Sequence, residues 1–219
     1  MAADYTLILG TKNLSSWSLR AYLALRATNA PFEEVLIRLL QPKTKAELLK
    51  YSPAGKVPVL QIYEHKHIAT VWDSLAICEP LAERHPEARL WPVNPTKRLQ
   101  ARSYAAEMHS GFSNLRDQLP MDFVRKHPLP ELTEGTKADI ARIIEAWSTA
   151  LVENGQTGKF LFGAYSIADI LYAPVVSRFL SYGVPLPATI ESYCHMCMAL
   201  PAMRDWMAGA KAEVDSGIA

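Results

Sequence analysis

The chain has few cysteines, no long apolar run and almost no net charge, and each shortage excludes a class of protein. Its 219 residues include only three cysteines, too few and too odd in number for a disulfide framework. No uninterrupted apolar stretch approaches the length of a membrane span, and no basic segment precedes an apolar run at the start of the sequence. We therefore expect a cytoplasmic protein without a membrane partner.

The balance of charges also limits the expected partners. Lysine and arginine together number 23 and aspartate and glutamate 22, so the formal net charge is +1. Proteins that bind nucleic acid or anionic membranes carry a basic excess or patch. Neither is an expected partner here. Hydrophobic residues make up 49% of the chain and charged residues 21%, which indicates a globular protein with enough apolar material for a core.

Two pairs of residues could suggest a metal or redox centre. Cys194 and Cys197 form a C-x-x-C pair, but they lie in an apolar, helix-like stretch with no second ligand pair nearby. We interpret them as packing residues. His65 and His67 flank a predicted hairpin turn without a third ligand, and we interpret them as solvated. The sequence therefore predicts no metal site.

The most informative stretch is residues 52–60, which read S-P-A-G-K-V-P-V-L. A proline cannot donate to a sheet ladder, so Pro58 belongs at a strand start, an edge or a bulge. We expect a cis turn at Val57-Pro58. The strands of a hairpin, 57–62 and 67–71, would then lead into an apolar helix that opens at Asp73-Ser74.

This arrangement predicts a binding site for a small acidic peptide. The backbone N–H and C=O of Val57 can pair with an extended peptide as an additional strand. The amides of Asp73 and Ser74, together with the Ser74 hydroxyl, form a donor-rich helix start that can receive a carboxylate. For Asp73, a simple helix N-cap is an alternative interpretation.

The pattern before residue 85 alternates strands and helices. Serines at 15, 16 and 18 can cap a helix whose apolar spacing begins at Leu19. A thiol bound near such a serine at a helix start would lose its proton more easily. With a strand at 5–9, a strand at 32–37 and a short helix at 43–49, the order is β-α-β-α-β-β-α. This is the thioredoxin-like order, with a mixed sheet and helices on each face.

Beyond residue 84 the pattern changes. Residues 85–95 contain three prolines and no periodicity, so we interpret them as a linker. No strand is predicted after it, and Ser166 with Asp169 forms an S-x-x-D capping box ahead of a buried helix. The expected domains are therefore 1–84, of α/β class, and 96–219, all helical. The helices are expected at 96–119, 135–154, 166 onward, 187–200 and 201–212.

At this point a family resemblance is clear. The strings S-P-A-G-K-V-P-V-L and W-D-S-L-A-I resemble the glutathione-binding half of the cytosolic glutathione transferases, which carries V-P and then [EQD]-S-x-A-I. G-A-Y-S-I-A-D-I and L-P-A-M-R-D-W-M are similar to later parts of the same family, so the resemblance covers nearly the whole chain. Within the family, S-S-W-S-L-R is most similar to the zeta-class signature S-S-C-S-W-R. Trp17 stands where zeta enzymes have cysteine.

The resemblance implies a set of site residues. Ser15, or Ser16 if the loop is shifted by one residue, would donate a hydrogen bond to the glutathione sulfur. Lys43 could meet the glycine carboxylate or could be a solvated charge, and Phe112 could wall the electrophile site between the domains or belong to the core. The implied glutathione contacts are Trp17, Lys43, Lys56, Val57, Pro58, Asp73 and Ser74, and the implied electrophile contacts are His109, Phe112 and Ser113.

The resemblance leaves three functions open. The first is glutathione transfer to a small hydrophobic electrophile, with glutathione as co-substrate and a homodimer as the expected assembly. The second is a zeta-like, glutathione-dependent cis-trans isomerase of the maleylacetoacetate type. The third is a non-catalytic glutathione or ligand-binding protein. A disulfide-reducing, omega-like role is disfavoured because no cysteine stands at the start of the first helix.

Overall fold

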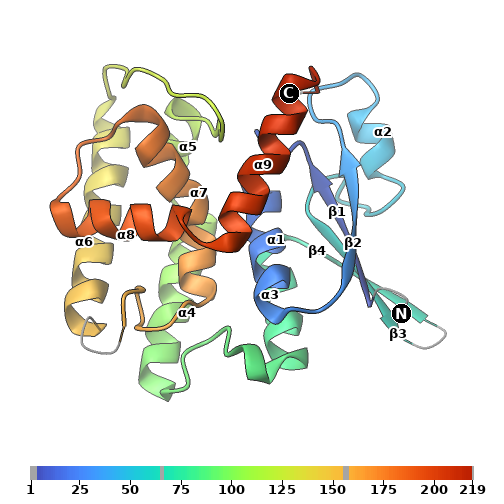
Figure 1. The fold of residues 1–219 in the computed structure, drawn as a ribbon, viewed down its shortest axis with the longest axis horizontal. Coiled ribbons are helices and arrows are strands. Elements are labelled where there is room, and N and C mark those ends of the chain that lie inside the picture. Colours follow the sequence, from blue (N-terminus) through green and yellow to red (C-terminus); the bar gives the residue numbers. More distant parts are fainter. Residues whose placement is uncertain (1–3, 65–66, 155–157, 219) are drawn as a thin grey trace. The chain divides into compact units, whose positions relative to one another are not determined.

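The computed structural model describes residues 4–64, 67–154 and 158–218 (Figure 1). By their internal contacts the residues form two compact units. Unit 1 comprises Met1–Ala88 and Asp205–Ala219, and unit 2 comprises Arg89–Arg204. Among the described residues, no helix combines the length and the apolar character needed to cross a membrane.

Unit 1 contains the predicted thioredoxin-like fold. Its four-stranded sheet has the order β2-β1-β3-β4, in which β1 and β2 are parallel and the other neighbouring pairs are antiparallel. The predicted turn at His65 and Lys66 lies outside the described residues. The elements are β1 (Tyr5–Gly10), α1 (Ser16–Thr28), β2 (Phe32–Ile37), α2 (Thr44–Leu48), β3 (Val59–Glu64), β4 (His67–Trp72), α3 (Ser74–Arg84) and the short 3-10 helix η1 (Pro86–Ala88).

The sheet of unit 1 is covered on both faces. Figure 1 shows α1 and α3 on one face and α2 on the other. Ile8 and Val59 pack with Leu48 of α2. Because side chains alternate along a strand, Leu7 and Leu60 point to the opposite face, and both are fully buried. The apolar strands therefore form the centre of the unit, and the loops at the strand ends remain available for a site.

The end of the chain belongs to unit 1. Helix α9 (Pro201–Asp215) begins in unit 2, but its residues from Asp205 onward group with the sheet domain. Asp205 pairs with Arg26 of α1 at 2.7 Å, and the Trp206 ring lies 5.0 Å from that of Tyr22. This grouping differs from the expected boundaries, which kept 96–219 together, because contacts distant in sequence hold the helix against α1.

Unit 2 is mainly helical and is built around α7. Helix α7 (Ile167–Tyr182) is buried along almost all its length. The ring of Trp147 packs against those of Tyr172 and Phe179 at centroid distances of 5.4 and 5.6 Å. The other helices of this unit are α4 (Pro95–Ser110), α5 (Ser113–Gln118), α6 (Glu134–Asn154) and α8 (Ala188–Met198).

The single helix expected over 96–119 is wrong, because the chain breaks between α4 and α5. Phe112 adopts the left-handed conformation, with φ of 58°, and Gly111 ends α4. The Arg116 guanidinium donates to the carbonyls of both residues. The bond to the Gly111 carbonyl satisfies an acceptor at the break, whereas the Phe112 carbonyl also accepts from the Arg116 amide at 3.3 Å. The apolar spacing continues through the break, so it does not reveal the interruption. The buried residues before, at and after it are Met108, Phe112 and Leu115.

Candidate functional site

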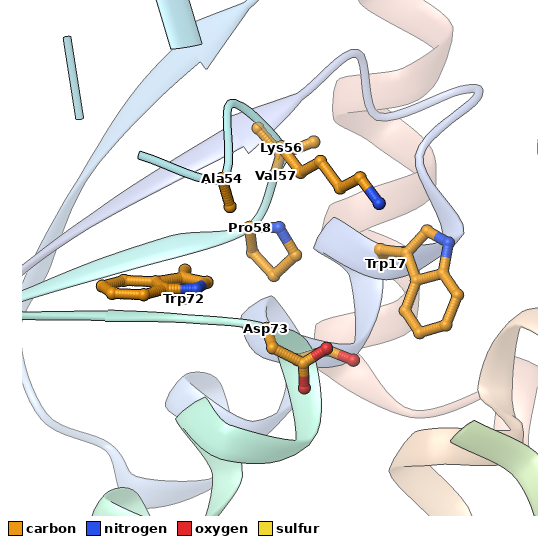
Figure 2. Close-up of a pocket in the computed structure, with 8 residues that line it drawn as sticks. Trp17, Ala54, Lys56, Val57, Pro58, Trp72 and Asp73 are labelled. Carbon is orange, nitrogen blue, oxygen red and sulfur yellow. The ribbon is translucent and has the colours of Figure 1, made fainter. Parts of the chain in front are cut away.

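A cavity of about 410 Å³ lies in unit 1 where four segments meet (Figure 2). These segments are the first turn of α1, the turn before β3, the end of β4 and the start of α3. In this view the Lys56 side chain extends toward the side of the cavity on which Trp17 lies. The lining residues are Trp17, Ala54, Lys56, Val57, Pro58, Trp72, Asp73 and Ser74.

The turn before β3 forms part of the wall of this cavity. Gly55 has φ of +56°, a conformation that glycine adopts without a side-chain penalty. The Gly55 amide donates to the Ser52 carbonyl at 3.0 Å, and the Ala54 amide donates to Ser52 Oγ at 3.2 Å. The Val57-Pro58 peptide bond is cis, as the sequence predicts. Both Val57 and Pro58 line the cavity.

The start of α3 presents donors to the same cavity. Asp73 is the N-cap, and its Oδ1 accepts from the amides of Leu75 at 2.9 Å and Ala76 at 3.3 Å. Ser74 is fully buried, and its Oγ has no hydrogen-bond partner among the described residues. A buried hydroxyl is normally hydrogen-bonded, and a helix N-terminus favours negative charge. A carboxylate bound in the cavity would satisfy both.

Trp17 is held in place by an arginine. The Arg20 guanidinium carbon lies 4.4 Å from the centroid of the Trp17 ring, and Arg20 itself is fully buried. Such stacking fixes the indole and keeps a delocalised positive charge behind it. The lining also holds Lys56 and the buried Ser74 hydroxyl, two groups that can receive a carboxylate.

The two candidate catalytic serines lie at the start of α1, next to the cavity lining in sequence. Ser15 is the N-cap, and its Oγ accepts from the Ser18 amide at 3.2 Å and donates to Ser18 Oγ at 2.8 Å. Ser18 Oγ in turn accepts from the Gly10 amide at 2.9 Å. Both Ser15 and Ser16 are buried, and neither is among the lining residues, whereas Trp17 is.

Other predicted site residues lie elsewhere. Lys43 is exposed at the start of α2 and is not among the lining residues. In unit 2, Phe112 is buried with its ring 6.5 Å from that of Tyr172, and Ser113 is exposed at the start of α5. His109 lies in the last turn of α4. Contacts of these residues with a substrate stay predictions.

Sequence reasoning did not identify Ala54 and Trp72 as lining residues. Trp72 ends the edge strand β4 directly before the N-cap of α3, and 44% of its surface is exposed. A large exposed aromatic residue next to a helix start is the signal that could have identified it. Ala54 carries no such signal, because it contributes through the shape of the turn.

The protein's own thiols are not suited to nucleophilic chemistry. Cys78, Cys194 and Cys197 are all free and buried. Burial raises the pKa of the Cys194 thiol to about 12, and it also raises the pKa of Cys78 and Cys197. Thiolate chemistry in this protein would therefore require a sulfur from a bound small molecule. No group of three or more His, Cys, Asp or Glu among the described residues is arranged to hold a metal ion.

Comparisons with known proteins point to one family. The family described as "Glutathione S-transferase, N-terminal domain" matches residues 14–84. Maleylacetoacetate isomerase from Rattus norvegicus is 30% identical over 197 residues, which cover 86% of this chain and 83% of the relative. A probable maleylacetoacetate isomerase from Caenorhabditis elegans is 29% identical over 162 residues, covering 74% and 72%. A glutathione transferase homologue from Burkholderia, crystallised with bound glutathione, has a TM-score of 0.70 at 21% identity, over 95% of this chain and 98% of that one.

Proposed function

Because the chain belongs to the cytosolic glutathione S-transferase family, we propose that it activates glutathione in the unit 1 cavity for attack on a small hydrophobic electrophile. The observation that carries this proposal is Ser74 Oγ, a buried hydroxyl without a partner among the described residues at the start of α3. A carboxylate of a bound peptide would accept a hydrogen bond from this hydroxyl. Loss of glutathione affinity in Ser74→Ala, measured by calorimetric titration, tests the proposal.

The tripeptide would be held by main-chain and helix-terminal groups. Its γ-glutamyl carboxylate would accept from Ser74 Oγ and from the Ser74 amide at the start of α3, since the next two amides already donate to Asp73. Its cysteinyl backbone would pair with the main chain of Val57 as an additional strand. Lys56 would supply a positive charge on the side of Trp17. Binding through backbone groups would make affinity insensitive to the identity of the Val57 side chain.

Activation would occur at the start of α1. A free thiol has a pKa near ~8.5, so only a small fraction of glutathione is thiolate at neutral pH. A serine hydroxyl that donates to the sulfur, together with the positive end of α1, would lower that pKa. The Ser15 hydroxyl donates to Ser18 Oγ, so it would have to rotate to donate to the sulfur instead. Ser16, the first residue of α1, is the alternative donor.

The chemical step requires no further group from the protein. The thiolate electron pair forms a bond to the electrophilic carbon. The displaced pair leaves with the leaving group in a substitution, or moves to the neighbouring atom in an addition and is then protonated by water. The rate gain would come from the larger thiolate fraction and from positioning.

The first prediction identifies the hydroxyl donor. Replacing that serine, Ser15 or Ser16, with alanine should lower conjugation of a chloro-nitroarene at pH 7 by up to about 30-fold, because a thiol whose pKa returns to ~8.5 is only about 3% thiolate at this pH. The apparent pKa of the pH–rate profile should rise toward the same value. Glutathione affinity should change little.

The control must separate thiol activation from helix capping. Ser15→Ala also removes the N-cap of α1, which costs about 1 kcal/mol of stability. Ser18→Ala breaks only the hydroxyl–hydroxyl bond and keeps the Ser15 cap and both candidate donors, while thermal unfolding of Ser15→Ala measures the capping loss separately. If wild type turns over the arene and neither Ser15→Ala nor Ser16→Ala moves the profile, the serine mechanism is wrong.

A second function is favoured by the relatives. The rat relative at 30% identity bears the name maleylacetoacetate isomerase. The same activated thiolate could add to a cis double bond, allow rotation about the resulting single bond, and leave again. Turnover of maleylacetone with no net consumption of glutathione would identify this reaction. Glutathione binding without turnover of either substrate would instead favour the non-catalytic role.

A further inference from the structure

One face of α9 contacts the loop that precedes the candidate serines. Trp206, Gly209 and Glu213 are spaced by three and four residues, so they lie on the same side of the helix. All three meet Lys12 or Asn13, in the loop between β1 and α1. We call these three α9 residues the loop clamp.

Two hydrogen bonds join the loop clamp to the loop backbone. Trp206 Nε1 donates to the Lys12 carbonyl at 3.0 Å, and Glu213 Oε2 accepts from the Asn13 amide at 3.2 Å. The Glu213 carboxylate also accepts a backbone hydrogen bond from Lys12. Trp206 is fully buried and Glu213 is 6% exposed. These bonds fix the loop main chain where it leaves the sheet.

The Lys12 side chain extends the contact along α9. Its Nζ pairs with Glu34 at 2.6 Å and lies 5.5 Å from the Trp206 ring centroid. A Cβ added at Gly209 would lie 2.8 Å from Lys12 Cδ. Glycine inside a helix costs about 1 kcal/mol relative to alanine. At this position it leaves room for the lysine stem to pass over the helix.

The fixed loop leads directly to the start of α1. The Thr11 carbonyl accepts from the amides of Leu14 at 3.1 Å and Ser15 at 2.9 Å. Thr11 Oγ1 accepts from the Leu39 amide at 3.0 Å. Asn13 is only two residues from Ser15. The loop segment that α9 contacts and the segment that carries Ser15 are therefore joined by short, hydrogen-bonded main chain.

We propose that Trp206 and Glu213 are positioning residues for thiol activation, because they hold the 11–15 loop so that the start of α1 faces the glutathione sulfur. This inference rests on the proposed function. Burying a carboxylate is expensive unless hydrogen bonds satisfy it. The bonds that satisfy Glu213 come from the loop beside the site, and a small displacement of a donor costs much of its catalytic effect.

The test compares Glu213→Gln and Trp206→Phe with Asp215→Asn, which changes an exposed carboxylate on the same helix. Each clamp variant should lower kcat for the chloro-nitroarene about tenfold and raise the apparent thiol pKa of bound glutathione, read from ultraviolet thiolate absorbance as a function of pH. The KM for glutathione should stay within about twofold, because all the described lining residues except Trp17 lie outside α1 and the clamped loop. The control should match wild type. Amide exchange of residues 12–15 should become faster in the clamp variants only.

The results for amide exchange and for thiol pKa together decide whether the loop clamp positions the start of α1. Faster exchange with an unchanged thiol pKa would overturn the positioning role and leave the proposed function intact. Wild type that binds no glutathione would overturn both. If Glu213→Gln does not fold, Gly209→Ala serves instead, since it displaces Lys12 and leaves the carboxylate in place. An unchanged thiol pKa in a folded Gly209→Ala variant with displaced loop amides would likewise overturn the inference.

Discussion

Replacing Asp169 with alanine is expected to lower the free energy of unfolding by about 3–5 kcal/mol, a large part of the 5–15 kcal/mol typical of folded proteins. Asp169 is almost fully buried. Its carboxylate accepts from the Leu161 amide at 3.0 Å, from Ser166 N and Oγ at 2.9 and 3.1 Å, and from the Tyr193 hydroxyl at 3.0 Å. Removing it leaves all these buried donors without an acceptor.

Urea denaturation followed by circular dichroism measures this loss. Asp117→Ala, which changes an exposed aspartate of unit 2, is the matched control and should fall within about 0.5 kcal/mol of wild type. An Asp169→Ala loss no larger than that of the control would contradict the role of this network. The predicted capping box of Ser166 and Asp169 is present, so the sequence alone identifies the residue.

The same carboxyl group makes stability depend on pH. Burial raises the pKa of Asp169 to about 6 from an ordinary 3.8, and its hydrogen bonds oppose part of that rise. The folded state therefore holds the proton more tightly than the unfolded chain. The stability that the folded protein gains from binding this proton is complete below pH 3.8 and is lost as the pH rises through 6. Compared with Asp169→Asn, wild type should lose stability across this window.

Replacing Ser74 with alanine should have opposite effects on the free and the bound protein. Glutathione affinity should fall by about 10–100-fold, since a hydrogen bond to a charged group contributes about 1.5–3 kcal/mol. The free protein should become slightly more stable, because Ser74 Oγ is buried without a partner among the described residues. Calorimetric titration with glutathione and thermal unfolding without it measure the two effects.

Ser177→Ala is the matched comparison. Ser177 is also a buried helical serine, but its Oγ donates to the Pro174 carbonyl at 2.9 Å. Its replacement should lower thermal stability and leave glutathione affinity unchanged. An unchanged glutathione affinity in Ser74→Ala would contradict the role of Ser74 Oγ on which the proposed function depends.

Much of unit 1 could be predicted from the residues that begin and end its strands and helices. Gly10 ends the first strand, the serines before Leu19 start α1, and Pro58 marks the entry to β3, so local chemistry sets these boundaries. The sequence also brings four lining residues together. In an antiparallel hairpin the start of the first strand and the end of the second lie at the same end of the sheet, so the turn before β3 lies next to the start of α3. These residues are Val57, Pro58, Asp73 and Ser74.

What the sequence could not predict depends on distant contacts. The break at Phe112 leaves the apolar spacing intact, so periodicity cannot reveal it. Helix α9 has an ordinary helical pattern, and its contacts with residues distant in sequence, among them Asp205–Arg26 and Glu213–Asn13, accompany the grouping of its end with unit 1. Residue types alone also leave open which of the two hydroxyls, Ser15 or Ser16, would donate to a bound sulfur.

The two-part composition of unit 1 has a consequence for engineering. All eight residues that line the cavity lie between Trp17 and Ser74, whereas the loop clamp comes from the last fifteen residues. Residues 89–204 are thus an insert within a discontinuous domain rather than a separable tail. A chimera designed to exchange the helical part between relatives has to be joined at both ends of this insert, because a single crossover near residue 88 would replace Trp206 and Glu213 as well.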